Sequence, residues 1–257
     1  MSTIIDWLLQ GDVSIQYLTR KYLLMENESD LEPLRERIAT EGWGHRFLSA
    51  RNENGHWGLW FYQPKWTSTH YTLLDMKNIG MPHHSKPCRE MVTRAFDECM
   101  LDNGGINFAK SMVQSDVAVD GMILNYASYF CPNESRIENL AEYTLHQTKA
   151  DGGYSWDQES EFSDPHTTIC VLEGFLEYRK AGFKKHAEEI RNSEEKAIEW
   201  LLSNKLFISE NKRYQKLSYP YRYRYDILRA LEYLALNNVP YDERMVPALE
   251  WLEVKKD

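Results

Sequence analysis

The sequence predicts an all-α fold, namely an α/α toroid of about five helical hairpins in a single domain over residues 1–257. A loop motif rich in glycine and aromatic residues recurs along the chain, and the apolar residues between its copies have helical spacing. Strand signals are sparse, since no Asn-Gly or Asp-Gly pair stands between two alternating apolar runs, as a β-hairpin would require.

The repeated loops surround Gly55, Gly104 and Gly152. Each loop is followed by a short polar segment and then by an apolar helix, and the intervals between the glycines are 49 and 48 residues. A nearly constant period of this size indicates one structural unit that is used several times.

Helices of two kinds are expected to alternate along the chain. One-sided apolar stripes predict amphipathic helices near 91–100, 137–145 and 190–202. The segment 169–176 is apolar almost all round, which predicts a helix that is buried on several sides.

Two further copies of the unit lack the glycines. Residues 219–226 lead into a predicted helix over 227–236, and residues 12–17 lead into an apolar segment over 18–25, which we interpret as a degenerate first copy. The resulting repeat units are predicted near residues 12–50, 51–100, 101–148, 149–204 and 205–257. Because the second helix of each pair is buried, the pairs are expected to close into a ring around a central cup. Helix N-termini and loop aromatics would line its mouth.

Charge and composition exclude several classes of function. The net charge of -9 at pH 7 argues against a nucleic-acid partner, which requires a positive surface. The four cysteines form no C-x-x-C pair and are expected to be reduced, packed thiols, without a zinc site. Met1–Gln10 has no basic region, and no run approaches about 20 apolar residues, so we expect a cytoplasmic protein without a transmembrane segment.

Two loops carry a family resemblance. Leu48-x-x-Arg51-x-x-x-Gly55-x-Trp57 resembles the Q-W repeat of squalene cyclases, with Arg51 in place of Gln, and Gln147 followed by 151–154 resembles a second, longer copy that ends in Tyr. Over its whole length the chain is similar to small bacterial squalene cyclase-like proteins of the terpenoid cyclase and protein prenyltransferase superfamily. The resemblance implies an α/α toroid and a hydrophobic, isoprenoid-like molecule in its central cavity.

The catalytic motifs of that superfamily are missing. Class II cyclases carry Asp-x-Asp-Asp, whereas the nearest feature here, Asp116 and Asp120, has a different spacing. No Asp, Cys and His set corresponds to the zinc site of the protein prenyltransferases. No metal is therefore expected, and the identity of any cofactor stays open.

The candidate catalytic residues are Asp116, Asp120, His70 and His166. When the units are aligned on the pairs Leu74-Asp75, Leu124-Asn125 and Leu172-Glu173, equivalent positions are occupied by His70, Asp120 and Thr168. Asp116 and Asp120 share a helical face, where mutual repulsion would raise one pKa and keep a proton for general-acid catalysis. The alternative is that Asp116 caps the helix while Asp120 faces solvent or pairs with a base, and that both histidines are structural.

The candidate substrate-binding residues are mostly aromatic. Loop and helix aromatics could line an apolar cavity and stabilise a carbocation, while Trp57 and Tyr154 of the loop motif are expected to be structural. An anion clamp near the C-terminus is the second possibility, and an ion pair among Arg222, Asp226 and Arg229 is its structural alternative. The full set is Trp60, Trp66, Trp156, Tyr126, Arg222, Tyr225 and Asp226.

Three functions stay open from the sequence. The first is an enzyme that acts on an isoprenoid-like molecule by carboxylic-acid chemistry. The second is a non-catalytic toroid that binds a ligand or serves as a scaffold. The third is a carbohydrate-active lyase or hydrolase, in which tryptophan stacks on sugars and carboxylates act as acid and base. A hydrophobic small molecule is the expected partner, and the oligomeric state is open.

Overall fold

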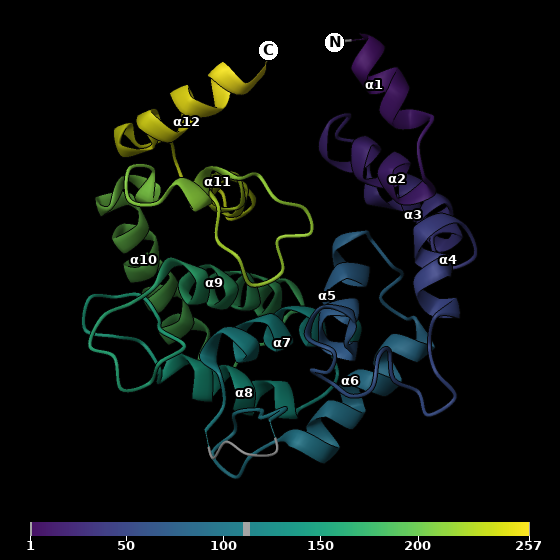
Figure 1. Ribbon diagram of the computed structural model, residues 1–257, viewed down its shortest axis with the longest axis horizontal. Coiled ribbons are helices and arrows are strands. Elements are labelled where there is room, and N and C mark those ends of the chain that lie inside the picture. Colours follow the sequence, from purple (N-terminus) through teal and green to yellow (C-terminus); the bar gives the residue numbers. More distant parts are fainter. Residues whose placement is uncertain (1, 110–113, 257) are drawn as a thin grey trace. The chain divides into compact units, whose positions relative to one another are not determined.

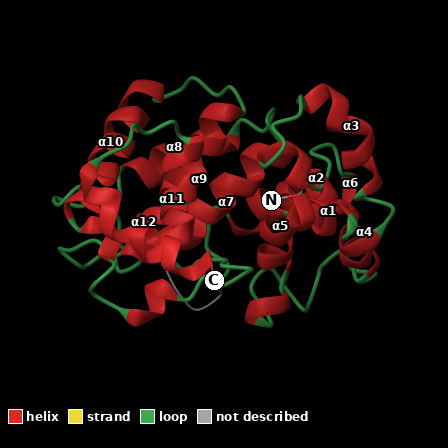
Figure 2. Cartoon of the chain, turned by 90° about the horizontal axis from the view of Figure 1, so that it is seen from above, coloured by secondary structure: helices red, strands yellow, loops and turns green. Residues whose placement is uncertain are grey.

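The computed structural model describes residues 2–109 and 114–256, and this part of the chain consists of helices and loops (Figures 1 and 2). No strand occurs in it, apart from one isolated bridge between Met100 and Ile106. The predicted all-α class is confirmed. The helices are α1 Ser2–Leu9, α2 Val13–Tyr22, α3 Glu28–Arg37, α4 Gly42–Ser49, α5 Thr69–Asn78, α6 Lys86–Cys99, α7 Val117–Phe130, α8 Arg136–Leu145, α9 Pro165–Lys180, α10 Ala187–Ser203, α11 Ile227–Leu236 and α12 Val246–Glu253.

Five short 3-10 helices accompany them. They are η1 Lys65–Thr67, η2 Lys205–Phe207, η3 Lys212–Gln215, η4 Glu243–Met245 and η5 Val254–Lys256. Among the described residues no helix is long and apolar enough to cross a membrane.

The chain divides into two compact units. The first extends to Glu98 and includes Tyr129–Cys131, and the second comprises Cys99–Ser128 and the residues from Pro132 onward. Helix α7 passes from one to the other, so that its last two residues belong to the first unit.

In the first unit, α2 contacts α1, α3 and α4, and α4 contacts α5. Asp12 begins this arrangement, because its carboxylate accepts from the Ser14 N–H at 3.0 Å and from the Trp43 N–H at 2.9 Å. It therefore caps α2 and joins it to α4. The cap starts the helix at Val13, so the sequence interpretation of 12–17 as a loop before a helix over 18–25 is wrong.

In the second unit, α9 contacts α8, α10 and α11. A buried ion pair joins three of these helices: the Arg179 guanidinium lies 2.7 Å from the Glu194 carboxylate and also donates to Asn237 Oδ1, while the Tyr233 hydroxyl donates to Glu194. Burial raises the pKa of Glu194, although the neighbouring Arg179 opposes the shift.

Glycines allow α7 and α9 to approach closely. A Cβ atom on Gly174 would lie 2.6 Å from the Gly121 carbonyl oxygen, and one on Gly121 would lie 2.7 Å from the backbone of α9 at Cys170. Any larger residue would force the two helices apart. This contact brings the following turn of α7, which carries Asn125, next to Glu173 of α9.

The predicted alternation of helix types is confirmed. In α5 the residues Thr69–Met76 are all buried, and most of α7 and α9 is buried as well. In contrast, α8 and α10 bury one stripe each, and those stripes contain the residues that the apolar spacing indicated, apart from Leu145, which is half-buried. Helix α11 has the predicted bounds.

The three glycine loops share one backbone geometry. Gly55, Gly104 and Gly152 have φ angles of +90°, +96° and +98°, which favour glycine. In each loop the glycine N–H donates to the carbonyl three residues earlier, at 2.9, 2.9 and 3.0 Å. An Asn or Asp side chain before the glycine accepts from the N–H after it, at 3.1, 3.1 and 3.4 Å. The sequence repeat is therefore also a structural repeat.

Aromatic residues join two of these loops to neighbouring helices. The Trp57 indole N–H donates to the Phe47 carbonyl of α4 at 2.6 Å. The Tyr154 hydroxyl lies 2.6 Å from the Ser193 hydroxyl of α10. Both rings are buried, so the structural role predicted for these two residues is confirmed.

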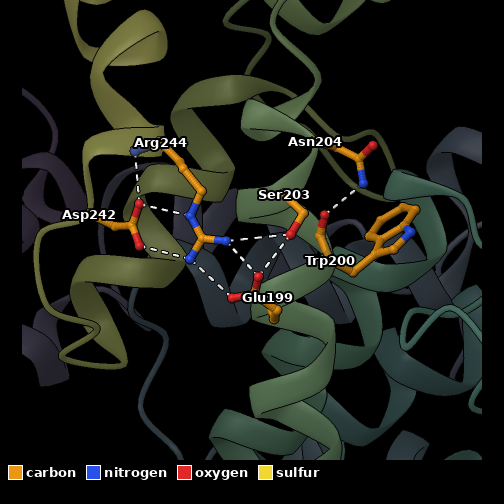
Figure 3. A network of polar contacts seen from close by, with 6 residues as sticks. All are labelled: Glu199, Trp200, Ser203, Asn204, Asp242 and Arg244. Carbon is orange, nitrogen blue, oxygen red and sulfur yellow. Dashed lines mark hydrogen bonds and ion pairs between the residues drawn. The ribbon is translucent and has the colours of Figure 1, made fainter.

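An ion network lies on the surface of the second unit (Figure 3). The Arg244 guanidinium lies between the carboxylates of Asp242 and Glu199, at 2.8 and 2.6 Å, and so joins η4 to α10. Hydrogen bonds from Arg244 lower the pKa of Asp242 to about 2. All three side chains are partly exposed, so the network contributes little to the stability of the fold.

The loop geometry predicts the effect of Gly104→Ala. Alanine at position 104 would have to adopt a positive φ, which costs about 1–2 kcal/mol. Its Cβ atom would also lie 2.8 Å from the Asn139 carbonyl oxygen of α8. Gly182→Ala is the matched control, since Gly182 has a φ of +90° and no atom within 4 Å of an added Cβ. In urea unfolding, Gly104→Ala should lower the midpoint clearly more than Gly182→Ala. Equal midpoints would contradict the packing of this loop against α8.

Candidate functional site

Asp120 of α7 lies at the centre of a buried polar network in the second unit. Its side chain is fully buried, and its carboxyl accepts from the Ile106 N–H at 2.9 Å and from the Ser115 hydroxyl at 2.6 Å. The network continues from Ser115 to the Tyr143 hydroxyl of α8 at 3.1 Å, and Gln158 donates to that hydroxyl at 3.0 Å. One carboxyl therefore joins α7 to the second glycine loop and, through Ser115, to α8.

The same position is occupied by threonine after the first and third glycine loops. The Thr69 hydroxyl accepts from the Trp57 N–H at 3.1 Å, and the Thr168 hydroxyl accepts from the Tyr154 N–H at 3.0 Å. Each of these N–H groups belongs to the second residue after the loop glycine, as the Ile106 N–H does. Thr69 is therefore the equivalent of Asp120, and the alignment that assigned His70 to this position is wrong by one residue.

Burial gives Asp120 an unusual acidity. Loss of solvent raises its pKa to about 7, although the hydrogen bonds from Ser115 and Ile106 oppose the shift. Asp116, whose repulsion was the expected cause, makes only a minor contribution. The equivalent residues Thr69 and Thr168 have neutral hydroxyl groups, so a neutral carboxyl is compatible with this position. At neutral pH a large fraction of Asp120 is protonated.

Asp116 serves as the cap of α7. Its carboxylate accepts from the Ala118 N–H at 2.9 Å and from the Val119 N–H at 3.4 Å. This agrees with the structural alternative for Asp116 that the sequence left open. At the start of α9, Asp164 accepts from the Thr167 N–H at 2.8 Å in the same way.

His70 belongs to the first unit and His166 to the second. His70 is fully buried beside Tyr71 and Tyr62, with ring centroids at 4.8 and 5.6 Å, and burial lowers its pKa to about 3, with a contribution from Lys65. It is therefore neutral at physiological pH and a weak base.

His166 is brought together with Tyr225, a second predicted site residue. The Tyr225 N–H donates to His166 Nδ1 at 2.7 Å, and burial lowers the pKa of the imidazole. The Tyr225 side chain is buried, and its hydroxyl donates to the Leu206 carbonyl. The histidine thus holds the segment before α11, and Asp226 caps this helix by accepting from the Arg229 N–H at 2.9 Å.

The predicted aromatic residues differ in exposure. Trp156 is 61% exposed and Trp66 is 38% exposed, so both can meet a ligand. Trp60 is half-buried, with its ring 4.9 Å from that of His56. Tyr126 is fully buried, and burial raises its pKa well above the ordinary value.

The sequence did not identify the main buried charges of the second unit. Arg229 of α11 pairs with Glu173 of α9 through two contacts of 2.7 and 2.8 Å, and Asn125 of α7 donates to Glu173 at 3.4 Å. The ion partner of Arg229 is thus Glu173. Arg229 gives Asp226 only its backbone N–H, so the predicted intrahelical ion pair between Asp226 and Arg229 is wrong. Arg222 lies before the helix, with a φ of +54°.

We call Asn125, Glu173 and Arg229 the buried polar cluster. The Arg229 side chain is 1% exposed and lies under the Tyr221 ring, 4.3 Å from its centroid. Burial alone would lower the pKa of Arg229, but Glu173 raises it and keeps the guanidinium charged. Through these contacts the cluster joins α7, α9 and α11, although a buried ion pair contributes little net stability compared with apolar packing.

Two open grooves occupy equivalent places at the first and third glycine loops, with volumes of about 710 and 630 Å³. Each lies between a glycine loop and an amphipathic helix, and neither is lined by a predicted site residue. Arg51 in the first is paired with Glu90 at 2.9 Å. We regard both grooves as products of the repeat geometry.

The described residues contain no group of three or more His, Cys, Asp or Glu side chains that could hold a metal ion. All four cysteines are buried free thiols, as expected. Burial raises the pKa of Cys170 to about 12, so this thiol stays protonated beside the buried polar cluster.

Asp120→Asn tests the acidity of the carboxyl. The folded protein holds a proton that the unfolded chain releases near its ordinary pKa of 3.8, so wild-type stability should decline by a few kcal/mol as the pH rises from about 4 to about 7. Asparagine keeps the acceptor for the Ile106 N–H and cannot ionise. Urea unfolding should show the variant gaining relative to wild type as the pH rises. Parallel stability curves would show that Asp120 has an ordinary pKa.

The buried ion pair gives a second prediction. Arg229→Met alone leaves Glu173 buried without its partner and should cost about 3–5 kcal/mol. Arg229→Met combined with Glu173→Leu should recover most of this loss, since no charge then stays buried. Denaturant titration of Arg229→Met, Glu173→Leu and the double variant measures the difference. A double variant as unstable as the sum of the two single variants would contradict the pairing.

Comparison with known proteins gives no relative: no protein-family model matches the chain, and no curated protein and no solved structure matches it either. The function therefore has to be inferred from the residues themselves.

Proposed function

We propose that this chain binds a hydrophobic, isoprenoid-like molecule, with its helical repeats closed into a squalene cyclase-like α/α toroid. The toroid is supported by the alternation of buried and amphipathic helices and by the three loops of identical backbone geometry. Hairpins of this kind cannot bury their apolar faces alone, so each must stack on its neighbours. Closure of the stack is our inference from the buried helices.

The observation that carries the proposal is the exposure of large apolar side chains on the third glycine loop. Trp156 is 61% exposed and Phe162 is 73% exposed. Rigid aromatic side chains of this kind dominate binding energies, because little conformational entropy is lost when a ligand covers them.

The loop that carries them is held firmly. Asp151 accepts from the Ser163 N–H at 3.0 Å and from its hydroxyl, which closes the loop at its base. Lys149 donates to the Gln158 carbonyl at 2.8 Å, and the Gln158 side chain donates to the Ser115 carbonyl at 2.9 Å. These hydrogen bonds hold the loop in one conformation, so Trp156 and Phe162 are exposed in fixed positions where a ligand can contact them.

Acid catalysis on the bound molecule is a second candidate function. It is favoured by Asp120, whose pKa of about 7 supplies the protonated carboxyl that general-acid chemistry needs. Against it stands the structural role of this carboxyl, which binds the second glycine loop in the manner of Thr69 and Thr168. We therefore propose binding as the primary function.

Binding can be tested by titrating the protein with farnesol and following its tryptophan fluorescence. Trp156→Ala should weaken farnesol binding about tenfold or more, as expected for a contact worth at least about 1.4 kcal/mol. Trp43→Ala is the matched control, because Trp43 is 56% exposed on α4, outside the glycine loops.

Equal effects of the two substitutions, or no binding of farnesol by the wild type, would contradict the proposal. Binding of maltohexaose in place of farnesol would instead favour the carbohydrate-active interpretation. If the wild type converts farnesol and Asp120→Asn binds it equally tightly without converting it, acid catalysis would be favoured over simple binding.

A further inference from the structure

The groove at the first glycine loop is lined by an excess of positive charge, although the chain as a whole has a net charge of -9. Its charged lining consists of four basic and two acidic side chains, namely Arg51, Lys86, Arg89, Arg94, Glu53 and Glu90. The groove at the third loop has the opposite balance, with one basic and three acidic side chains, namely Lys196, Asp151, Glu195 and Glu199. The repeat geometry accounts for the place that both grooves share, but not for this difference in charge.

Two arginine side chains converge beside the glycine of the first loop. A Cβ atom on Gly55 would lie 3.1 Å from Arg51 Nη2 and 3.1 Å from Arg94 Nη1. Since both nitrogens lie at this distance from one point, the two guanidinium groups are close enough for one tetrahedral anion to contact both. Glycine leaves the space beside them open, because it has no side chain.

Arg51 is held in place and keeps one nitrogen for a ligand. Its Nε donates to the Gly55 carbonyl at 2.7 Å, and its Nη1 donates to the Glu90 carboxylate at 2.9 Å. Within residues 2–109 and 114–256, Arg51 Nη2 forms no hydrogen bond. The two N–H groups of this nitrogen are therefore donors in fixed positions, which lowers the entropic cost of binding an acceptor.

Arg94 is fixed by three partners. Its Nε donates to Glu98 at 2.8 Å, its Nη1 donates to the Asn54 carbonyl at 2.8 Å, and its Nη2 donates to His56 Nε2 at 3.2 Å. A guanidinium has five N–H donors, two of them on Nη2. The second N–H of Arg94 Nη2 is therefore left for a ligand, beside that of Arg51.

Helix α6 supplies further donors along the other wall of the groove. Lys86, Arg89 and Thr93 follow one another at intervals of three and four residues, so they share a face of the helix. Arg89 is exposed and forms no ion pair with the described residues. Glu90, the acidic side chain nearest to these groups, lies 2.9 Å from Arg51 and 3.8 Å from Lys86, so its charge is already balanced.

This set of donors fits a phosphate group better than a carboxylate. A phosphate monoester carries a charge of about -1.5 to -2 at neutral pH and has three strong acceptor oxygens, whereas a carboxylate has one charge and two oxygens. Guanidinium groups bind phosphate through paired hydrogen bonds. The groove volume of about 710 Å³ also lies within the range of small-molecule sites.

We propose that this groove binds a phosphate group, with Arg51 Nη2 and the remaining N–H of Arg94 Nη2 donating to its oxygens and with Arg89 adding charge at the rim. The site lies at the first glycine loop and takes a charged group, so it is additional to the hydrophobic binding proposed above.

The ligand class can be tested by isothermal titration calorimetry with phenyl phosphate, inorganic phosphate and phenyl sulfate. Phenyl phosphate should bind more tightly than phenyl sulfate, which has the same ring and only one negative charge. Tighter binding of phenyl phosphate than of inorganic phosphate would assign the group to an organic ester, and equal binding would assign it to the free ion. Both results support a phosphate site.

The residues can be tested with two variants and a control. Arg51→Lys keeps the charge but loses the fork, and it should weaken phenyl phosphate binding about tenfold or more. Arg89→Gln removes an exposed charge that has no partner and should weaken binding about two- to fivefold. Arg213→Gln is the matched control, because Arg213 is an exposed arginine of η3, outside the groove. It makes the same change in net charge and should leave the affinity unchanged.

Equal effects of Arg89→Gln and Arg213→Gln would overturn the site, and this comparison holds even if Arg51→Lys does not fold. Unchanged affinity in a folded Arg51→Lys variant, equal binding of phenyl sulfate and phenyl phosphate, or no binding of either phosphate at millimolar concentration would overturn it as well. Farnesol binding through Trp156 is measured separately, so the proposed function does not depend on these results.

Discussion

The structure depends on one repeated contact, in which the backbone of a glycine loop is bound by a side chain of the buried helix that follows. Thr69, Asp120 and Thr168 each accept the N–H of the second residue after the loop glycine. The positive φ of that glycine turns the chain so that this N–H faces the helix. Without the contact, a buried donor would lose its partner at each turn between helices, at a cost of about 1–3 kcal/mol.

Asp120 is the unusual member of this set. A carboxyl replaces a hydroxyl at a place that has no access to water, and burial therefore favours its protonated form. The neighbouring Ser115 and Tyr143 extend this position into a chain of polar groups, as His56 and Arg94 do from Thr69 at the first glycine loop. The second glycine loop is thus bound by a group that can also hold a proton.

Much of the local structure could be predicted from the sequence, whereas the pairing of distant charges could not. The loop period and the helix types follow from short patterns, whereas the raised pKa of Asp120 comes from its burial and not from the repulsion by Asp116 that the spacing suggested. The Glu173–Arg229 pair joins residues 56 positions apart and depends on how α9 and α11 pack. The alignment at His70 failed because Leu74 lies five positions after Thr69, whereas Leu124 and Leu172 lie four positions after Asp120 and Thr168. The leucines therefore do not keep a constant distance from the residue that binds the loop.

The most direct test of the repeated contact is hydrogen exchange measured at single amides. We expect the Trp57, Ile106 and Tyr154 amides to exchange slowly and with similar protection, because each donates to a buried side chain. The exposed residue Glu53 of the first loop supplies the reference for fast exchange. If any of the three exchanged as fast as Glu53, that loop would not be held by its helix, and the common geometry of the repeats would be refuted.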